Sequence, residues 1–91
     1  MNWIMNLNHL QYFLETCRYG SITKASEVCH ISQPSITAAI NNLEKELGAK
    51  LFDRVNNRLR LTVVGEGFKD LTEEFLKTFD DYCQSAYDIA S

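Results

Sequence analysis

The last third of this 91-residue chain carries a single apolar row that constrains the fold more than any other feature. From residue 64 to residue 89 an apolar side chain returns at every third or fourth position, which is the spacing of one face of an α-helix. Such a helix would extend for ~40 Å, too far for the small domain ahead of it to cover. The row consists of Val64, Phe68, Leu71, Phe75, Phe79, Tyr82, Ala86 and Ile89.

An uncovered row of this length needs a partner, because every apolar side chain left in water forgoes the free energy of burial. The same helix of a second chain, in a closed two-fold dimer, is the expected partner. The alternative is that the helix folds back onto its own domain, which its first turn alone could do. Thr62 is expected to cap this helix, and Gly65 and Gly67 to weaken its first turn. The predicted dimerisation residues are Phe68, Leu71, Phe75, Phe79, Tyr82, Ala86 and Ile89.

Two shorter helices are expected near the start of the chain. Asn6 is a good N-cap, apolar residues recur at helical spacing after it, and Gly20 can end the first helix. Ser21 can cap a second helix, in which Ala25 and Val28 are expected to face inward. A short turn over residues 29–31 then leads into a third helix.

The third helix is expected to begin at Ser32, with Pro34 tolerated in its first turn, and to end at Gly48. Its predicted inner face is Ile36, Ile40, Leu43 and Leu47. Its opposite face carries short and mostly polar side chains, namely Pro34, Ala38, Asn41, Asn42 and Lys45, with Thr37 beside them. Two helices joined by a short turn form a helix-turn-helix motif over about residues 22–41. The motif is geometric, and by itself it is only weakly specific for DNA binding.

Residues 51–62 are typical of a short β-hairpin. Asn56 and Asn57 suit its turn, while Arg58 and Arg60 alternate with leucines along one strand. Arg54 lies near the same tip. Three arginines on a ribbon beside the third helix would make a wing that grips phosphates. The alternative is a solvated basic edge strand that only resists aggregation.

The charge distribution divides the chain into two segments that differ in net charge. The net charge of −3 argues against nucleic acid at first sight. However, residues 1–62 hold seven basic and five acidic side chains, a balance of +2, whereas residues 63–91 hold two basic and seven acidic ones, a balance of −5. Only the first part is therefore suited to phosphate.

Other classes of protein lack support in the sequence. The three cysteines stand at 17, 29 and 83 without a Cys-x-x-Cys pair, which indicates reduced thiols in the cytoplasm and no metal site. No apolar run is long enough for a membrane span. Nucleophile–base pairs, carboxylate dyads and phosphate-binding glycine loops are missing, so we expect neither an enzyme nor a cofactor.

Five motifs in these segments, in this order along the chain, resemble the DNA-binding end of LysR-type transcriptional regulators. Ser-Gln-Pro followed by Leu-Glu-x-x-Leu-Gly-x-x-Leu-Phe is the most specific part. The motifs are Leu7-x-x-Leu10-x-x-Phe13; Gly20-Ser21-Ile22-Thr23-x-Ala25; His30-Ile31-Ser32-Gln33-Pro34-Ser35-Ile36; Ile40-x-x-Leu43-Glu44-x-x-Leu47-Gly48-x-x-Leu51-Phe52-x-Arg54; and Arg60-Leu61-Thr62-x-x-Gly65.

The resemblance implies a mainly α fold: a winged helix-turn-helix of three helices and a hairpin over residues 5–62, then a linker and dimerisation helix over 63–91. It implies a bacterial, cytoplasmic homodimer that binds dyad promoter sites in double-stranded DNA. The third helix would enter the major groove and the wing would touch the neighbouring backbone. Family members usually continue into an effector-binding domain, which we expect these residues to lack.

The DNA-binding residues that the resemblance and the patterns indicate are Ser32, Gln33, Pro34, Ser35, Thr37, Ala38, Asn41, Lys45, Arg54, Arg58 and Arg60. Two departures matter. Met1 to Ile4 precede the usual beginning of the family, and Trp3 among them is expected to pack against either the domain or the linker helix. In addition, the family commonly has Ser-Arg-Gln where this chain has Thr37-Ala38-Ala39. Without that arginine a bidentate contact to guanine is lost, so we expect a preference for A·T-rich sites and modest affinity. The alternative function is a winged-helix interaction and dimerisation module with weak or no DNA binding.

Overall fold

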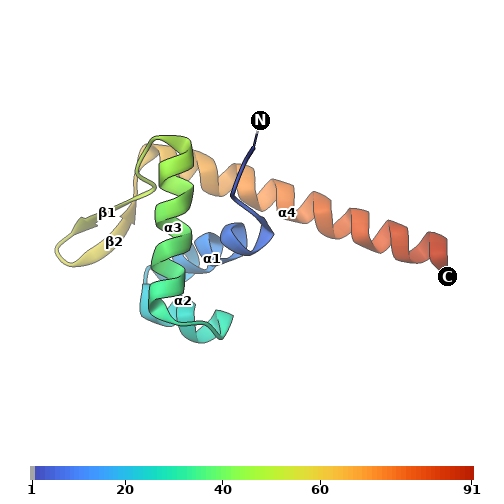
Figure 1. Cartoon of the computed structure of the whole chain (residues 1–91), viewed down its shortest axis with the longest axis horizontal. Coiled ribbons are helices and arrows are strands. Elements are labelled where there is room, and N and C mark those ends of the chain that lie inside the picture. The colour runs from blue at the N-terminus through green and yellow to red at the C-terminus, as the bar shows by residue number, and fades with distance from the viewer. Residues whose placement is uncertain (1) are drawn as a thin grey trace.

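The computed structural model describes residues 2–91 and contains four helices and one β-hairpin (Figure 1). The predicted mainly α fold, with three short helices, a hairpin and a long final helix, is confirmed. The elements in chain order are α1 (Leu7–Tyr19), α2 (Ile22–Cys29), α3 (Gln33–Leu47), β1 (Phe52–Val55), β2 (Arg58–Leu61) and α4 (Val63–Ala90).

Helix boundaries follow the capping residues. The side chains of Asn6, Ser21 and Ser32 each accept a hydrogen bond from the backbone N–H three residues further on, at the starts of α1, α2 and α3. Gly20 and Gly48 end α1 and α3 in the left-handed conformation that glycine adopts most easily. Local chemistry therefore sets the starts of these helices and the ends of α1 and α3, as predicted. Cys29, expected in the turn, instead belongs to α2, which ends at His30 in the left-handed conformation with a φ of 58°.

The core lies where α1 crosses α3 and meets the start of α4. Phe13 is fully buried, and its ring centroid lies 5.5 Å from that of Phe52 and 5.0 Å from that of Phe68. Leu43 and Leu51 are fully buried in the same cluster. One aromatic residue of α1 thus holds the hairpin and α4 against the helix-turn-helix.

The inward face of α2 differs in part from the prediction. Ala25 is fully buried, as expected, but Val28 is 39% exposed. Half-buried Ile22 and Cys29 complete the inner face instead. At 100° per residue, Cys29 lies only 40° from Ala25 on the helix, whereas Val28 lies 60° away on the other side. Packing against α3 selects the side that includes Cys29.

The two faces of α3 are largely as predicted, with corrections near its end. Ile36, Ile40 and Leu43 are buried, but Leu47 in the last turn is 37% exposed. Asn42 is half-buried, because its Nδ2 donates to Glu46 Oε1 at 3.1 Å, and it does not belong to the free polar face.

The hairpin has a two-residue turn in which Asn56 and Asn57 have φ values of 53° and 62°. Two consecutive left-handed residues form the turn type that matches the twist of paired strands, and asparagine tolerates that conformation. The register pairs Arg54 with Leu59, Val55 with Arg58 and Asp53 with Arg60.

The beginning of α4 is fixed to the base of the hairpin. Thr62 Oγ1 accepts from the Gly65 N–H at 2.9 Å and donates to the Lys50 carbonyl at 2.7 Å. Gly65 is buried directly against the Leu51 carbonyl, and a Cβ atom there would overlap that oxygen. The missing side chain thus allows a close approach that anchors the helix, which offsets the weakening expected from a glycine in the first turn.

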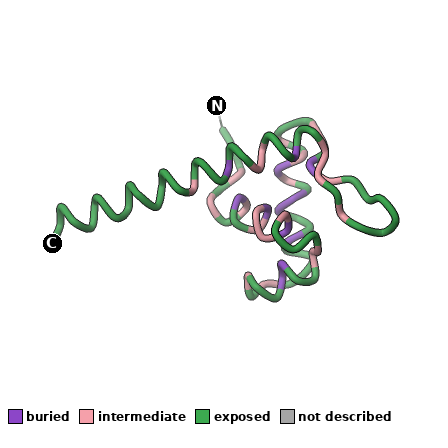
Figure 2. Tube along the Cα trace, turned by 180° about the vertical axis from the view of Figure 1, so that it is seen from behind, coloured by how far each residue is buried: buried purple, intermediate pink, exposed green. Residues whose placement is uncertain are grey.

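The molecule measures 51 × 30 × 21 Å, and the outer part of α4 projects away from the rest of it (Figure 1). Figure 2 shows that burial changes along the helix: the buried and half-buried residues of α4 all lie before or at Leu76, and every residue beyond it is exposed. The apolar row stays open, with Leu71, Tyr82 and Ile89 exposed by 63%, 68% and 89%. Folding back onto its own domain therefore accounts only for the inner half of α4.

Candidate nucleic-acid interface

The outer face of α3 is free of contacts with the core. All the residues that the sequence assigns to DNA binding on this helix and its cap are exposed, and most of their side chains are short. A flat polar face of this kind can approach base edges closely in a major groove. The exposed residues are Ser32, Gln33, Pro34, Ser35, Thr37, Ala38, Asn41 and Lys45.

Ser32 is the N-cap of α3. Its Oγ accepts from the Ser35 N–H at 3.2 Å and lies 2.9 Å from the Ser35 Oγ. The two hydroxyls therefore hydrogen-bond to each other, and the Ser32 hydroxyl also caps the start of the helix. They nevertheless remain exposed at a helix N-terminus, where backbone N–H groups and the helix dipole favour an anion.

An open cleft of about 430 Å³ lies between the wing and the helix-turn-helix. Gln33 and Thr37 from α3 line it on one side, and Arg54 and Arg58 from the hairpin line it on the other. The fold thus brings together two groups of predicted residues that are some twenty positions apart in the sequence. Sequence reasoning missed three further polar residues in this cleft: Ser21, which was assigned to a cap, Asn57, which was assigned to a turn, and Thr23, which appeared only in a motif.

The three arginines do not share one surface of the wing, although the sequence places them near one tip. Cross-strand partners point to the same face of a ribbon. The register therefore puts Arg54 on the face of Leu59, and Arg58 and Arg60 on the opposite face with Val55 and Asp53. Arg54 and Arg58 still reach the cleft from the two sides of a twisted hairpin, whereas Arg60 does not line it.

Glu44 holds the wing in place relative to α3. Its Oε2 accepts from the backbone N–H of Leu51 at 2.8 Å, and its Oε1 lies 3.6 Å from Lys50 Nζ. Only 10% of this side chain is exposed. The carboxylate therefore faces the base of the wing and not the free polar face of α3.

The electrostatics of the cleft favour an anion. Among residues 2–91, no ion pair neutralises the three wing arginines. All seven acidic residues of the segment 63–91 lie on α4, which leaves the domain on the side away from the hairpin (Figure 1). The positive potential is therefore concentrated on the wing and the negative potential on the projecting helix.

Thiols and metal ligands offer no competing site. Burial raises the pKa of the Cys17 thiol to about 12, although the nearby Lys69 ammonium acts in the opposite direction. Burial also raises the pKa of Cys29. In the described part of the chain, no group of three or more His, Cys, Asp or Glu side chains could hold a metal ion. Likewise, no described helix combines the length and apolar character that a membrane span requires.

Comparison with known proteins identifies the family. Residues 7–66 match the model of the bacterial regulatory helix-turn-helix proteins of the lysR family. The chain is 49% identical over 57 residues to the uncharacterised regulator YwbI of Bacillus subtilis, covering 63% of this chain and 19% of YwbI. It is 41% identical over 61 residues to the transcriptional activator LysR of Escherichia coli, covering 67% of this chain and 20% of LysR. The chain thus spans about a fifth of these curated relatives.

Solved structures agree with this assignment. The BenM DBD/catB site 1 DNA complex superimposes with a TM-score of 0.91 and 34% identity, covering 96% of this chain and 97% of that one. The CbnR DBD–DNA complex gives a TM-score of 0.89 and 28% identity, covering 96% and 100%. The chain therefore belongs to the LysR family of bacterial regulatory helix-turn-helix proteins.

Proposed function

We propose that this chain is the DNA-binding part of a transcription regulator, and that it binds dyad promoter sites sequence-specifically as a homodimer. The observation that carries this proposal is the cleft in which Gln33 and Thr37 of α3 face Arg54 and Arg58 of the wing. Groups that can hydrogen-bond base edges stand beside groups that bind phosphate. The names of the matched structures, which describe DNA complexes, support the same function.

In this proposal α3 enters the major groove. Gln33 can donate to and accept from adenine, Thr37 and Asn41 offer further polar contacts, and the Ala38 methyl suits a thymine methyl. Arg54 and Arg58 bind the flanking phosphates, and Ser32 with the exposed start of α3 binds another. Lys45 and Arg60, which do not line the cleft, add further positive charge to the surface.

The homodimer in this proposal forms through the exposed row of α4. The open side chains Phe75, Phe79 and Tyr82 stack along the helix, with centroid distances of 6.3 Å for each successive pair. A two-fold axis across this row would cover it in both chains at once. Two copies of α3 would then face half-sites about 34–36 Å apart, one turn of DNA.

The test is selection of bound sequences from random duplex DNA, followed by fluorescence anisotropy titrations of the selected site at several salt concentrations. We expect a dyad site and an affinity that falls steeply with salt. Arg54→Ala and Arg58→Ala should each lower the log–log salt slope by about 0.9, the value for one phosphate contact. Arg60→Ala is the matched control on the same hairpin, and its effect should be smaller because Arg60 lies outside the cleft and opposite Asp53.

An interaction and dimerisation module is the second candidate, since the exposed row on α4 and the absence of an arginine at Ala38 both favour it. The variant with Arg54, Arg58 and Arg60 all replaced by alanine separates the two. Loss of DNA affinity with an intact dimer supports the regulator. Affinity that does not fall with salt, or selection that enriches no sequence, would favour the module.

A further inference from the structure

We propose that the segment ahead of α1, residues 2–5, forms one wall of the surface that α4 of a second copy covers, with Trp3 as the contact and Glu46 as the clamp. This inference rests on the homodimer proposed above and adds a part of the interface outside the α4 row. It also connects the C-terminal turn of α3 to that interface.

The clamp consists of one carboxylate and two backbone groups. Glu46 Oε2 accepts from the Ile4 N–H at 2.7 Å, and Glu46 Oε1 accepts from the Met5 N–H at 2.6 Å. Asn42 Nδ2 donates to the same Oε1 at 3.1 Å and so orients the carboxylate. Hydrogen bonds to an ionised acceptor are stronger than neutral ones. A segment outside any helix is therefore fixed to the last turns of α3.

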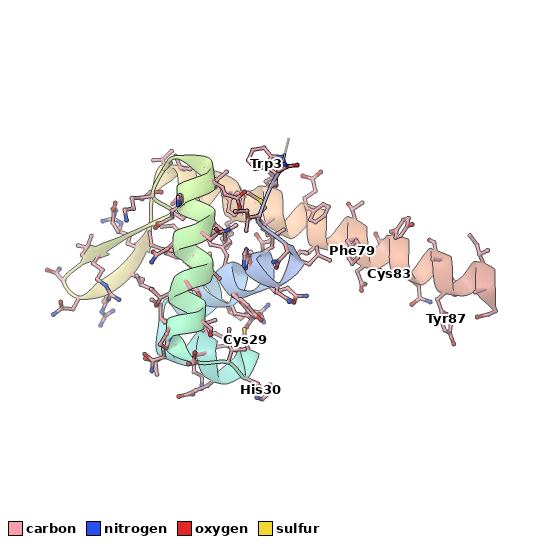
Figure 3. All side chains as sticks on the ribbon, in the orientation of Figure 1. Trp3, Cys29, His30, Phe79, Cys83 and Tyr87 are labelled. Carbon is pink, nitrogen blue, oxygen red and sulfur yellow. The ribbon has the colours of Figure 1, made fainter. Side chains whose placement is uncertain are left out.

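The fixed segment completes an apolar groove of about 560 Å³. Its walls come from the segment itself, from α1, from the end of α3 and from the inner half of α4. Figure 3 shows the Trp3 ring near the start of the chain, beside the inner part of α4. The principal wall residues are Trp3, Leu7, Leu47, Phe68, Leu71 and Phe75.

The groove is open although its lining is apolar. Trp3 is 58% exposed, Leu71 63% and Phe75 46%. Aromatic and aliphatic side chains left this accessible on one contiguous surface mark an interaction site, because their burial would release free energy. The clamp holds Trp3 in place at this surface instead of leaving it to move freely in solvent.

A second copy of this chain is the occupant that fits. Leu71 and Phe75 belong both to the groove and to the exposed row of α4, so one covering element would bury the two together. The outer half of α4 supplies such an element, because its own row is equally open. A two-fold contact places the row of each chain against the row and groove of the other, and no second kind of surface is required.

The sole tryptophan of the chain makes this testable, because its fluorescence reports the surroundings of the proposed contact directly. We would dilute the full chain through its dimer dissociation range and record both sedimentation and tryptophan emission, excited selectively over tyrosine. Emission should shift to the blue, and quenching by acrylamide should fall, in proportion to the dimer fraction. Phe79→Asp provides the monomer reference, in which Trp3 should stay accessible at every concentration.

Two substitutions test the contact and the clamp separately. Trp3→Ala should weaken dimerisation at least about tenfold, because each dimer loses two buried indoles. Glu46→Gln keeps the shape but removes the charge, so it should weaken dimerisation in the same direction by a smaller factor. Glu27→Gln on α2, outside the groove, is the matched control and should leave the dissociation constant unchanged. Circular dichroism confirms that each variant folds.

The outcomes distinguish this inference from the proposed function. A chain that stays monomeric at all concentrations would overturn both. A dimer in which Trp3 remains accessible to acrylamide, and which Trp3→Ala does not weaken, would overturn this inference alone and leave the homodimer standing. Because Trp3 is mostly exposed in the single chain, its replacement tests the interface without endangering the fold.

Discussion

The inner and outer halves of α4 continue one helix but lie in different surroundings. In the inner half, Gly65 is buried against Leu51 and Thr72 is only 2% exposed. In the outer half, every residue from Lys77 onward is exposed, including Tyr82 and the apolar Ile89. The domain therefore covers three turns of the helix and leaves the rest to solvent or to a partner.

The covered face and the apolar row are not the same face. The residues that pack on the domain, Gly65, Phe68, Thr72 and Leu76, lie about a quarter turn around the helix from Leu71 and the row beyond it. Phe68, predicted for the dimer, is half-buried against Phe13 of its own chain. The difference teaches that periodicity tells which side chains share a face, whereas packing decides which face the domain uses.

Placing a charge in the outer half should give the largest effect. Phe79→Asp would bury two unpaired carboxylates in each dimer, at a cost of about 4 kcal/mol or more, so dimerisation should weaken about a thousandfold. Sedimentation equilibrium measures this directly. The free energy of unfolding of the monomer should hardly change, since Phe79 is 38% exposed and lies beyond the packed part of α4.

Gln84→Asp is the matched control for this substitution, because it introduces the same residue with the same charge change. Gln84 lies about 140° around the helix from Phe79, on the face opposite the row. Its replacement should leave the dimer intact. Equal weakening by both variants would mean that the row is not the interface and that charge alone disturbs association.

A methyl group in the inner half should have the next largest effect. Gly65→Ala forces a Cβ atom into the Leu51 carbonyl, so we expect the free energy of unfolding to fall by about 3 kcal/mol. Gly67→Ala adds the same methyl two residues on, where nothing in the described chain lies within 4 Å. It should raise stability by up to ~1 kcal/mol, because alanine favours a helix over glycine. Urea denaturation compares the two, and similar results would refute the close approach.

Near neutral pH the smallest expected effect concerns Cys17, which packs in the core cluster that includes the inner half of α4 and influences stability only at alkaline pH. Burial raises its pKa from 9.0 to about 12, so the unfolded chain loses this proton first as the pH rises. The free energy of unfolding should therefore fall between these two pH values and be unaffected by this thiol below them. Cys17→Ala should flatten the decline relative to the unmodified chain, whereas Cys83→Ala, at an exposed position, should not.

Much of the fold follows from local sequence. The caps at Asn6, Ser21 and Ser32 and the glycines after α1 and α3 set the helix ends, because capping uses atoms only a few residues apart. The outer face of α3 could be predicted from spacing for the same reason. Asn42 and Val28 could not. Asn42 donates to Glu46 of its own helix, but that carboxylate also binds the segment ahead of α1, and the exposure of Val28 depends on how α2 packs.

The candidate site was predicted residue by residue, but its shape was not. The alternation in the hairpin indicated Arg58 and Arg60, yet only the strand register shows that Arg54 lies on the other face and that Arg60 stands opposite Asp53. The cleft itself depends on Glu44 holding the wing base against α3. The spacing of apolar residues along the sequence does not reveal this contact, because it joins α3 to the base of the wing.

The sequence by itself determined the helices, the two-residue turn, the polar outer face of α3 and the existence of a long apolar row, because these depend on short-range spacing and on the preferences of single residues. Only the tertiary structure decided where that row diverges from the face that packs, why Gly65 must lack a side chain, and that Glu46 binds the backbone of Ile4 and Met5. Those outcomes depend on distances between atoms far apart in the chain, which close packing of the whole domain sets.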